Sequence, residues 1–141
     1  MININNGNIS INDGRFIITK SLTKNGFMNS NLYNDVISQQ THMFSNYYLK
    51  PQLIGKDKFI MTLVFNPSDM IYLVNICLSN EGDKPTWDNW SQYEVLKIKN
   101  KNDEWLEKNI GKPPYKYSWG EISSNYDPRS GSSMISIRYD I

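Results

Sequence analysis

At 141 residues, the chain has the usual length of one domain and can bury roughly two thirds of the surface that it exposes when extended. Hydrophobic residues make up 39% of the chain and aromatic residues 13%, which excludes a disordered segment. The formal net charge is +1 and no run of five like charges occurs, so we expect no nucleic-acid partner.

Cysteine use and the apolar segments set expectations about the compartment. Cys77 is the only cysteine, so no disulfide forms within the chain, and its apolar neighbours predict a buried thiol. The first seven residues, MININNG, lack the basic start and apolar stretch of a signal peptide. Nowhere do 18 apolar residues run together. We expect a cytoplasmic protein that does not contact a membrane.

Two-residue alternation at the start of the chain predicts a β-hairpin. Ile9 and Ile11 alternate with polar residues, and Phe16 and Ile18 resume the same period. Between them, residues 12–14 read Asn-Asp-Gly, which favours left-handed turn conformations.

The next segment predicts a short helix that follows a polar connector at residues 21–30. Its apolar residues are spaced i, i+1, i+4 and i+5, which places them on one helical face: Leu32, Tyr33, Val36 and Ile37. Asn29 or Ser30 is the expected N-cap, and the helix is expected to end near Gln40.

Residues 45–79 predict a meander of three strands. Pro51 interrupts the first strand, which favours an edge position or a bulge. Residues 59–65 are apolar on both faces apart from Thr62, so this strand is expected at the centre of the sheet. An Asn-Pro-Ser-Asp turn at 66–69 leads to the third strand, residues 70–78, which is also expected to be buried on both sides.

A second, longer helix is predicted at about residues 91–110, after a polar linker. Ser91 and Glu94 have the spacing of a capping box, and Gly111 and Pro113 end the helix. The apolar residues keep a helical spacing: Val95, Ile98, Trp105, Leu106 and Ile110. The charged residues between them are interpreted as a solvated face.

The C-terminal segment predicts a hairpin. Residues 115–126 alternate but change parity at Trp119-Gly120, which is typical of a bulge, and a turn at 127–131 leads to a strand at 134–139. The predicted order is therefore β-β-α-β-β-β-α-β-β. We expect a single α+β domain, residues 1–141, with a mostly antiparallel sheet and two helices packed on one face.

Few residues suggest catalysis or metal binding. His42 is the only histidine and lies in a predicted loop, and the apolar setting of Cys77 argues against a nucleophile. Glu81, Asp83 and Asp88 lack the ligand spacing of a calcium loop and are interpreted as solvated. Asp103, Glu104 and Glu107 are interpreted as helix surface charge, although Asp103 and Glu107, one helical turn apart, could form an acid/base pair. We predict no catalytic residue, no metal site and no cofactor.

Aromatic residues are the most unusual feature of the second half of the chain. Packing of the long helix against the C-terminal hairpin explains most of them, and those that stay exposed predict anchors for a protein partner, because Trp and Tyr dominate interface hot spots. The expected partner-binding residues are Trp87, Trp90, Tyr117, Tyr126, Asp127 and Arg129.

Several C-terminal motifs resemble those of small bacterial proteins of unknown function. They are 87–91 (Trp-Asp-Asn-Trp-Ser), 105–106 (Trp-Leu), 111–115 (Gly-Lys-Pro-Pro-Tyr) and especially 119–131 (WGEISSNYDPRSG), and the likeness covers roughly the last 55 residues. Some of these proteins accompany toxins of interbacterial competition. The resemblance implies an immunity protein that binds a cognate toxin domain and neutralises it.

Other function classes stay open beside this binding protein. One is a small enzyme or ligand-binding domain with a pocket between the long helix and the sheet. There, Asp103, Glu107, Tyr117 or Tyr126 would supply the polar groups. A structure without a concave pocket at that place would exclude it. A structural adaptor is the third class.

Overall fold

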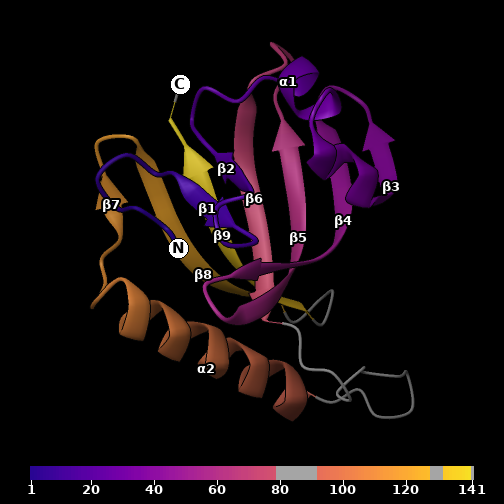
Figure 1. Cartoon of the computed structure of the whole chain (residues 1–141). Helices are drawn as coiled ribbons and strands as arrows, with labels where there is room; N and C mark the ends of the chain where they lie inside the picture. The colour runs from indigo at the N-terminus through magenta and orange to yellow at the C-terminus, as the bar shows by residue number, and fades with distance from the viewer. Residues whose placement is uncertain (79–91, 128–131, 141) are drawn as a thin grey trace.

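The computed structural model describes residues 1–78, 92–127 and 132–140 of the chain. Within these ranges it contains nine strands, two α-helices and one 3-10 helix, which confirms the predicted α+β class (Figure 1). In chain order the elements are β1 (Ile9–Ile11), β2 (Phe16–Ile18), α1 (Lys24–Met28), the 3-10 helix η1 (Asn31–Asp35), β3 (Val36–Thr41), β4 (Ser45–Ile54), β5 (Asp57–Phe65), β6 (Ile71–Leu78), α2 (Gln92–Asn109), β7 (Lys116–Tyr117), β8 (Gly120–Asp127) and β9 (Ser132–Tyr139).

Seven strands form one antiparallel sheet in the order β3-β4-β5-β6-β9-β8-β7, and β1 and β2 form a separate hairpin. The meander and the C-terminal hairpin meet where β6 pairs with β9, over the register from Leu73 with Arg138 to Ile76 with Ile135. β5 lies inside the sheet between β4 and β6, as its apolar residues predict, although the middle position belongs to β6.

Both α-helices pack on the same face of the sheet, at its opposite ends (Figure 1). Phe27 of α1 stacks on Phe65 with ring centroids 5.6 Å apart, and Trp105 of α2 meets Phe59 edge-on at 4.8 Å. Phe59 and Phe65 are an even number of positions apart in β5, so their side chains share one face. The first hairpin contributes fully buried residues to the same core: Ile9, Ile11 and Ile18.

The N-terminal segment is attached to the β7–β8 turn and to β9 by two long-range hydrogen bonds. The indole Nε1 of Trp119 donates to the carbonyl oxygen of Ile4 at 2.7 Å, and the buried hydroxyl of Tyr139 donates to the carbonyl oxygen of Gly7 at 2.8 Å. Gly7 has a φ of 77°, and a Cβ atom there would lie 2.6 Å from the Trp119 ring. The close approach of this backbone to the indole therefore requires glycine.

The prediction of an α-helix at residues 30–40 is wrong. The α-helix lies earlier, at Lys24–Met28 in the predicted connector, where the Thr23 hydroxyl accepts from the Gly26 amide at 3.0 Å. The predicted helical segment is instead η1 followed by strand β3, which pairs with β4. Leu32 is buried and Tyr33 and Val36 pack against the core, whereas Ile37 is 65% exposed, so the four residues do not form the predicted helical face. Tertiary pairing with β4 overrides the local spacing.

The bulge predicted at Trp119-Gly120 is also wrong. Tyr117 pairs with Gly120 across a tight β7–β8 turn, and β8 then pairs with β9 without a register shift from Gly120 to Asp127. The parity change therefore marks a chain reversal. Pro51 does coincide with a predicted bulge, since the β4–β5 register shifts between Leu49 and Gln52.

Replacement of Gly120 by alanine tests the β7–β8 turn. Gly120 has a φ of 157°, and a Cβ atom there would collide with the backbone carbonyl oxygen of Arg138. We expect Gly120→Ala to lower the free energy of unfolding by more than about 3 kcal/mol, measured by urea denaturation. Gly111→Ala is the matched control, because φ is also positive there, at 110°, but a Cβ atom meets nothing within 4 Å. It should cost only about 1–2 kcal/mol, and equal losses would contradict this account.

Burial of the Tyr139 hydroxyl predicts a loss of stability at high pH. Burial raises the pKa of Tyr139 far above its usual value, so above about pH 10 the unfolded chain releases a proton that the folded chain keeps. The free energy of unfolding should therefore fall as pH rises above about 10, by up to about 1.4 kcal/mol per pH unit from this group. In Tyr139→Phe the fall should be shallower, as measured by urea denaturation at several pH values. Parallel curves for the two proteins would contradict the assignment.

Candidate functional site

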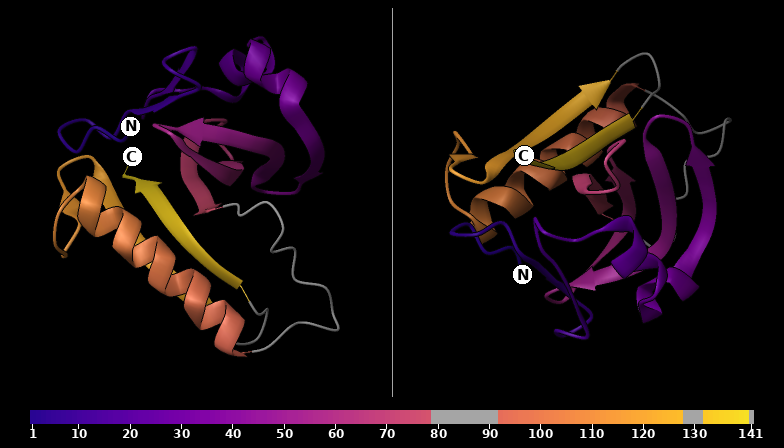
Figure 2. Two further views of the ribbon diagram at one scale, coloured as in Figure 1. Left: turned by 60° about the horizontal axis from the view of Figure 1, so that its bottom comes forward. Right: turned by 90° about the horizontal axis from the view of Figure 1, so that it is seen from above.

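A cavity of about 510 Å³ lies between α2 and the start of β8, closed at one end by the segment that joins α2 to β7. We call it the α2–β8 groove. Its lining residues are Lys99, Asp103 and Glu107 of α2, residues 113–116 of the connection, and residues 121–124 of β8. Figure 2 shows α2 running alongside the β8–β9 hairpin in both views.

The helix wall of the groove is a single stripe. Lys99, Asp103 and Glu107 follow at intervals of four residues, which places them above one another on one side of α2. The helix is fixed in this rotation by its buried side. There, Leu106 is fully buried, and the Nε1 of Trp105 donates to Asp57 at 3.0 Å.

The closed end of the groove is built by the helix C-terminus. The Tyr115 hydroxyl donates to the carbonyl oxygen of Gly111 at 2.8 Å, just after α2 ends. The carbonyl oxygen of Tyr115 in turn accepts from the backbone amide of Ile122 at 2.9 Å. Tyr115 therefore ties the end of α2 to the outer edge of β8.

The outer edge of β8 is open beyond this point. β7 pairs only with Gly120 and Glu121, and none of the other strands in the described ranges pairs with this edge. Backbone groups of a strand alternate between its two edges, so Ser124 and Tyr126 present their amide and carbonyl groups on the same side as Ile122. The outer edge of β8 therefore carries backbone donors and acceptors at Ser124 and Tyr126, next to the groove, that are unpaired among the described residues.

The charges around the groove are mostly paired. Lys99 Nζ lies 2.7 Å from an Asp103 carboxylate oxygen, and Arg138 lies 3.5 Å from Glu121. Glu107 is exposed and forms no ion pair with any residue that the structure describes. Burial raises the pKa of the Tyr115 hydroxyl, and the negative charge of Glu107 raises it further.

One polar atom on the groove has no partner. The Ser124 hydroxyl oxygen is buried and makes no hydrogen bond within the described part of the chain. Ser124 lines the groove from the β8 side, so the hydroxyl lies at the border between the core and the cavity. A buried hydroxyl without a partner costs roughly 1–3 kcal/mol.

Only some of the predicted partner-binding residues can be placed. Tyr117 is half-buried and stacks on Trp119, with ring centroids 5.1 Å apart. Tyr126 is half-buried near the far end of β8, which Asp127 ends. Trp87, Trp90 and Arg129 lie outside the described residues. Tyr117 and Tyr126 are separated by most of the length of β8, so the structure does not bring these two together.

Only part of the set of polar residues that was expected to line a pocket between the long helix and the sheet does line the groove. Asp103 and Glu107 line the groove, whereas Tyr117 and Tyr126 do not. The sequence reasoning missed further lining residues: Lys99, Tyr115, Lys116, Glu121 and Ser124. The four-residue spacing from Lys99 to Glu107 is the signal that could have identified the helix wall. The β8 residues carry no such signal, because their role depends on where α2 lies.

The single cysteine and the single histidine lie away from the groove. Cys77 is half-buried at the end of β6, and burial raises the pKa of its thiol, which keeps it protonated. His42 is exposed between β3 and β4. Across residues 1–78, 92–127 and 132–140, no group of three or more potential metal-ligating side chains occurs.

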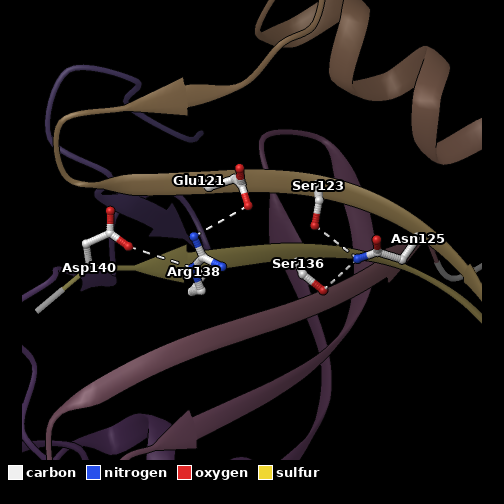
Figure 3. A network of polar contacts seen from close by, with 6 residues as sticks. All are labelled: Glu121, Ser123, Asn125, Ser136, Arg138 and Asp140. Carbon is white, nitrogen blue, oxygen red and sulfur yellow. Dashed lines mark hydrogen bonds and ion pairs between the residues drawn. The ribbon is translucent and has the colours of Figure 1, made fainter.

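The face of the sheet opposite the helices carries a polar network. Asn125 donates to the hydroxyls of Ser123 and Ser136, at 3.0 and 3.4 Å (Figure 3). Ser136 in turn donates to Asn75 at 2.7 Å. Leu73 and Cys77 are only half-buried here, so the second face of β6 is less buried than the sequence predicts.

Arg138 extends this network toward the end of β9. It lies between Glu121, at 3.5 Å, and Asp140, at 3.7 Å (Figure 3). Arg138 itself is largely exposed, so these ion pairs contribute little to stability. We interpret the network as a solvated sheet face.

None of the helices in the described ranges is long and apolar enough to cross a membrane. No family model matches this chain, and no curated protein or solved structure shows significant similarity to it.

Proposed function

We propose that this chain is a non-enzymatic binding protein, an immunity protein that neutralises a cognate bacterial toxin domain in the cytoplasm by direct contact. The observation that supports a binding role is the α2–β8 groove beside the open edge of β8. A strand edge with unpaired backbone groups is a template for another chain, and proteins usually protect it. The identity of the partner as a toxin rests on the C-terminal resemblance.

Two tryptophans pack inside the protein, so the proposed interface rests on other residues. Trp105 and Trp119 are buried, and each indole nitrogen has a partner inside the protein. They therefore serve the core, as does Tyr117 where it stacks on Trp119. Tyr126 and Asp127 keep their proposed role, because they lie at the open end of β8. Trp87, Trp90 and Arg129 stay proposals for the same interface.

Co-expression with the protein encoded by the neighbouring gene tests the proposal. We expect the neighbour to stop bacterial growth when expressed alone, and this chain to restore growth and to elute with it as one complex in size-exclusion chromatography. The control is co-expression with an unrelated toxin of similar size, whose effect on growth should not change. A harmless neighbour that forms no complex would overturn the proposed function.

A small-molecule ligand is a second candidate, favoured by the size of the groove. Its volume of about 510 Å³ lies in the range of ligand pockets, and Asp103 and Glu107 would supply polar contacts. Native mass spectrometry of the purified chain should then detect a bound molecule, and its mass should be lost after denaturation. Glu107→Gln should reduce the occupied fraction, whereas Glu104→Gln, on the same helix but not lining the groove, should not. An unliganded mass in every preparation would count against this candidate.

A further inference from the structure

We propose that the partner binds the α2–β8 groove as an added β-strand, an extended peptide segment that pairs with β8 beyond β7 and places a basic side chain beside Glu107. This inference rests on the proposed binding function and specifies how the same site recognises its partner. It is argued from three features of the groove: the open backbone edge, the position of β7 and the helix wall.

The open edge determines the conformation of the bound segment. Ser124 and Tyr126 together present two amide donors and two carbonyl acceptors toward this side, by the alternation that starts at Ile122. Only a backbone in extended conformation offers donors and acceptors with a matching repeat. Strand addition of this kind draws affinity from main-chain hydrogen bonds and specificity from alternate side chains.

β7 shows that this edge accepts an antiparallel strand. Lys116 and Tyr117 pair with Glu121 and Gly120, and the Ile122 amide already donates to Tyr115. The chain then turns away toward α2, so its own strand stops where the groove opens. A segment opposite residues 123–127 would continue the same line, and at about 3.4 Å per residue it would contain roughly five residues.

The helix wall determines the chemistry of the bound side chains. Every second side chain of an added strand would face the stripe of Lys99, Asp103 and Glu107. Lys99 and Asp103 already neutralise each other at 2.7 Å, whereas Glu107 is exposed and forms no ion pair with the described residues. A lysine or arginine of the partner would complete the pairing at Glu107.

The opposite edge of the sheet offers a weaker site. β3 pairs with β4 on one side, and most of its residues are exposed. No stripe of helix residues flanks it in the described ranges. A segment added there would gain backbone hydrogen bonds without side-chain recognition, so the observations favour β8.

The probe for the experiment is a phage-displayed library of random peptides, selected against the full-length chain. We expect enriched peptides that contain a lysine or arginine within an extended segment and that bind as synthetic peptides. N-methylation at every second peptide residue should abolish binding in one register and leave it nearly unchanged in the other, because only alternate amides pair with β8. Hydrogen exchange should show new protection at the amides of Ser124 and Tyr126 on binding.

Charge reversal on α2 provides the matched comparison. Glu107→Lys should weaken binding of the selected peptides by about tenfold or more. Glu104→Lys is the control, because Glu104 is also exposed on α2 but does not line the groove, and it should change binding less than about twofold. Both substitutions are at exposed positions, so both variants should fold.

The outcomes separate this inference from the proposed function. Strand addition would be overturned if both sets of alternate N-methylated peptides bound equally well, or if bound peptides protected the amides of β3 instead of those of β8. The binding function would be left intact. A complex with the toxin encoded by the neighbouring gene would also overturn strand addition alone if it protected the amides of neither Ser124 nor Tyr126 from hydrogen exchange. If no peptide is enriched and no toxin complex forms, both the inference and the proposed function are wrong.

Discussion

The pairing of β6 with β9 joins segments that are about 60 residues apart into one sheet. Without it, the meander β3 to β6 and the hairpin β8–β9 would be two sheets with exposed apolar faces. The pair brings together residues that are almost fully buried: Val74, Ile76, Ile135 and Ile137. α1, α2 and the β1–β2 hairpin then have one continuous apolar face to cover, and Trp119 and Tyr139 fasten the N-terminal segment over its end.

The same pairing creates the candidate site. α2 follows β6 in the chain and precedes β7, which lies at the outer edge of the sheet. The helix therefore passes alongside β9 and β8. Its buried side, with Trp105 and Leu106, sets the rotation that points Lys99, Asp103 and Glu107 toward β8. β7 has two residues and β8 has eight, so most of the edge beside the helix has no backbone partner among the described residues. The groove is therefore a consequence of a short edge strand, β7, next to a long helix.

The aromatic surplus serves two purposes that composition cannot separate. Trp105 and Trp119 bury their rings and satisfy each indole nitrogen with Asp57 and the Ile4 carbonyl, which is the usual condition for a tryptophan in a core. Tyr115 instead holds the end of α2 against β8 and forms the closed end of the groove. Whether an aromatic residue is an exposed anchor or part of the core therefore depends on its neighbours in the folded chain, which the sequence does not show.

The sequence by itself determined the features that depend on neighbouring residues. A continuous apolar run identified β5, and helical spacing and Gly111 identified α2. The Asn-Asp-Gly turn takes the left-handed conformations that it favours. Only the tertiary structure decided that residues 36–41 form a strand and that Trp119-Gly120 belongs to a chain reversal. It also decided that no strand within residues 1–78, 92–127 and 132–140 covers the edge of β8 beyond β7. The reason is physical: a turn or a helical face is set by residues a few positions apart. Which strand pairs with which, and which edge is left without a partner, is set by contacts between residues far apart in the chain.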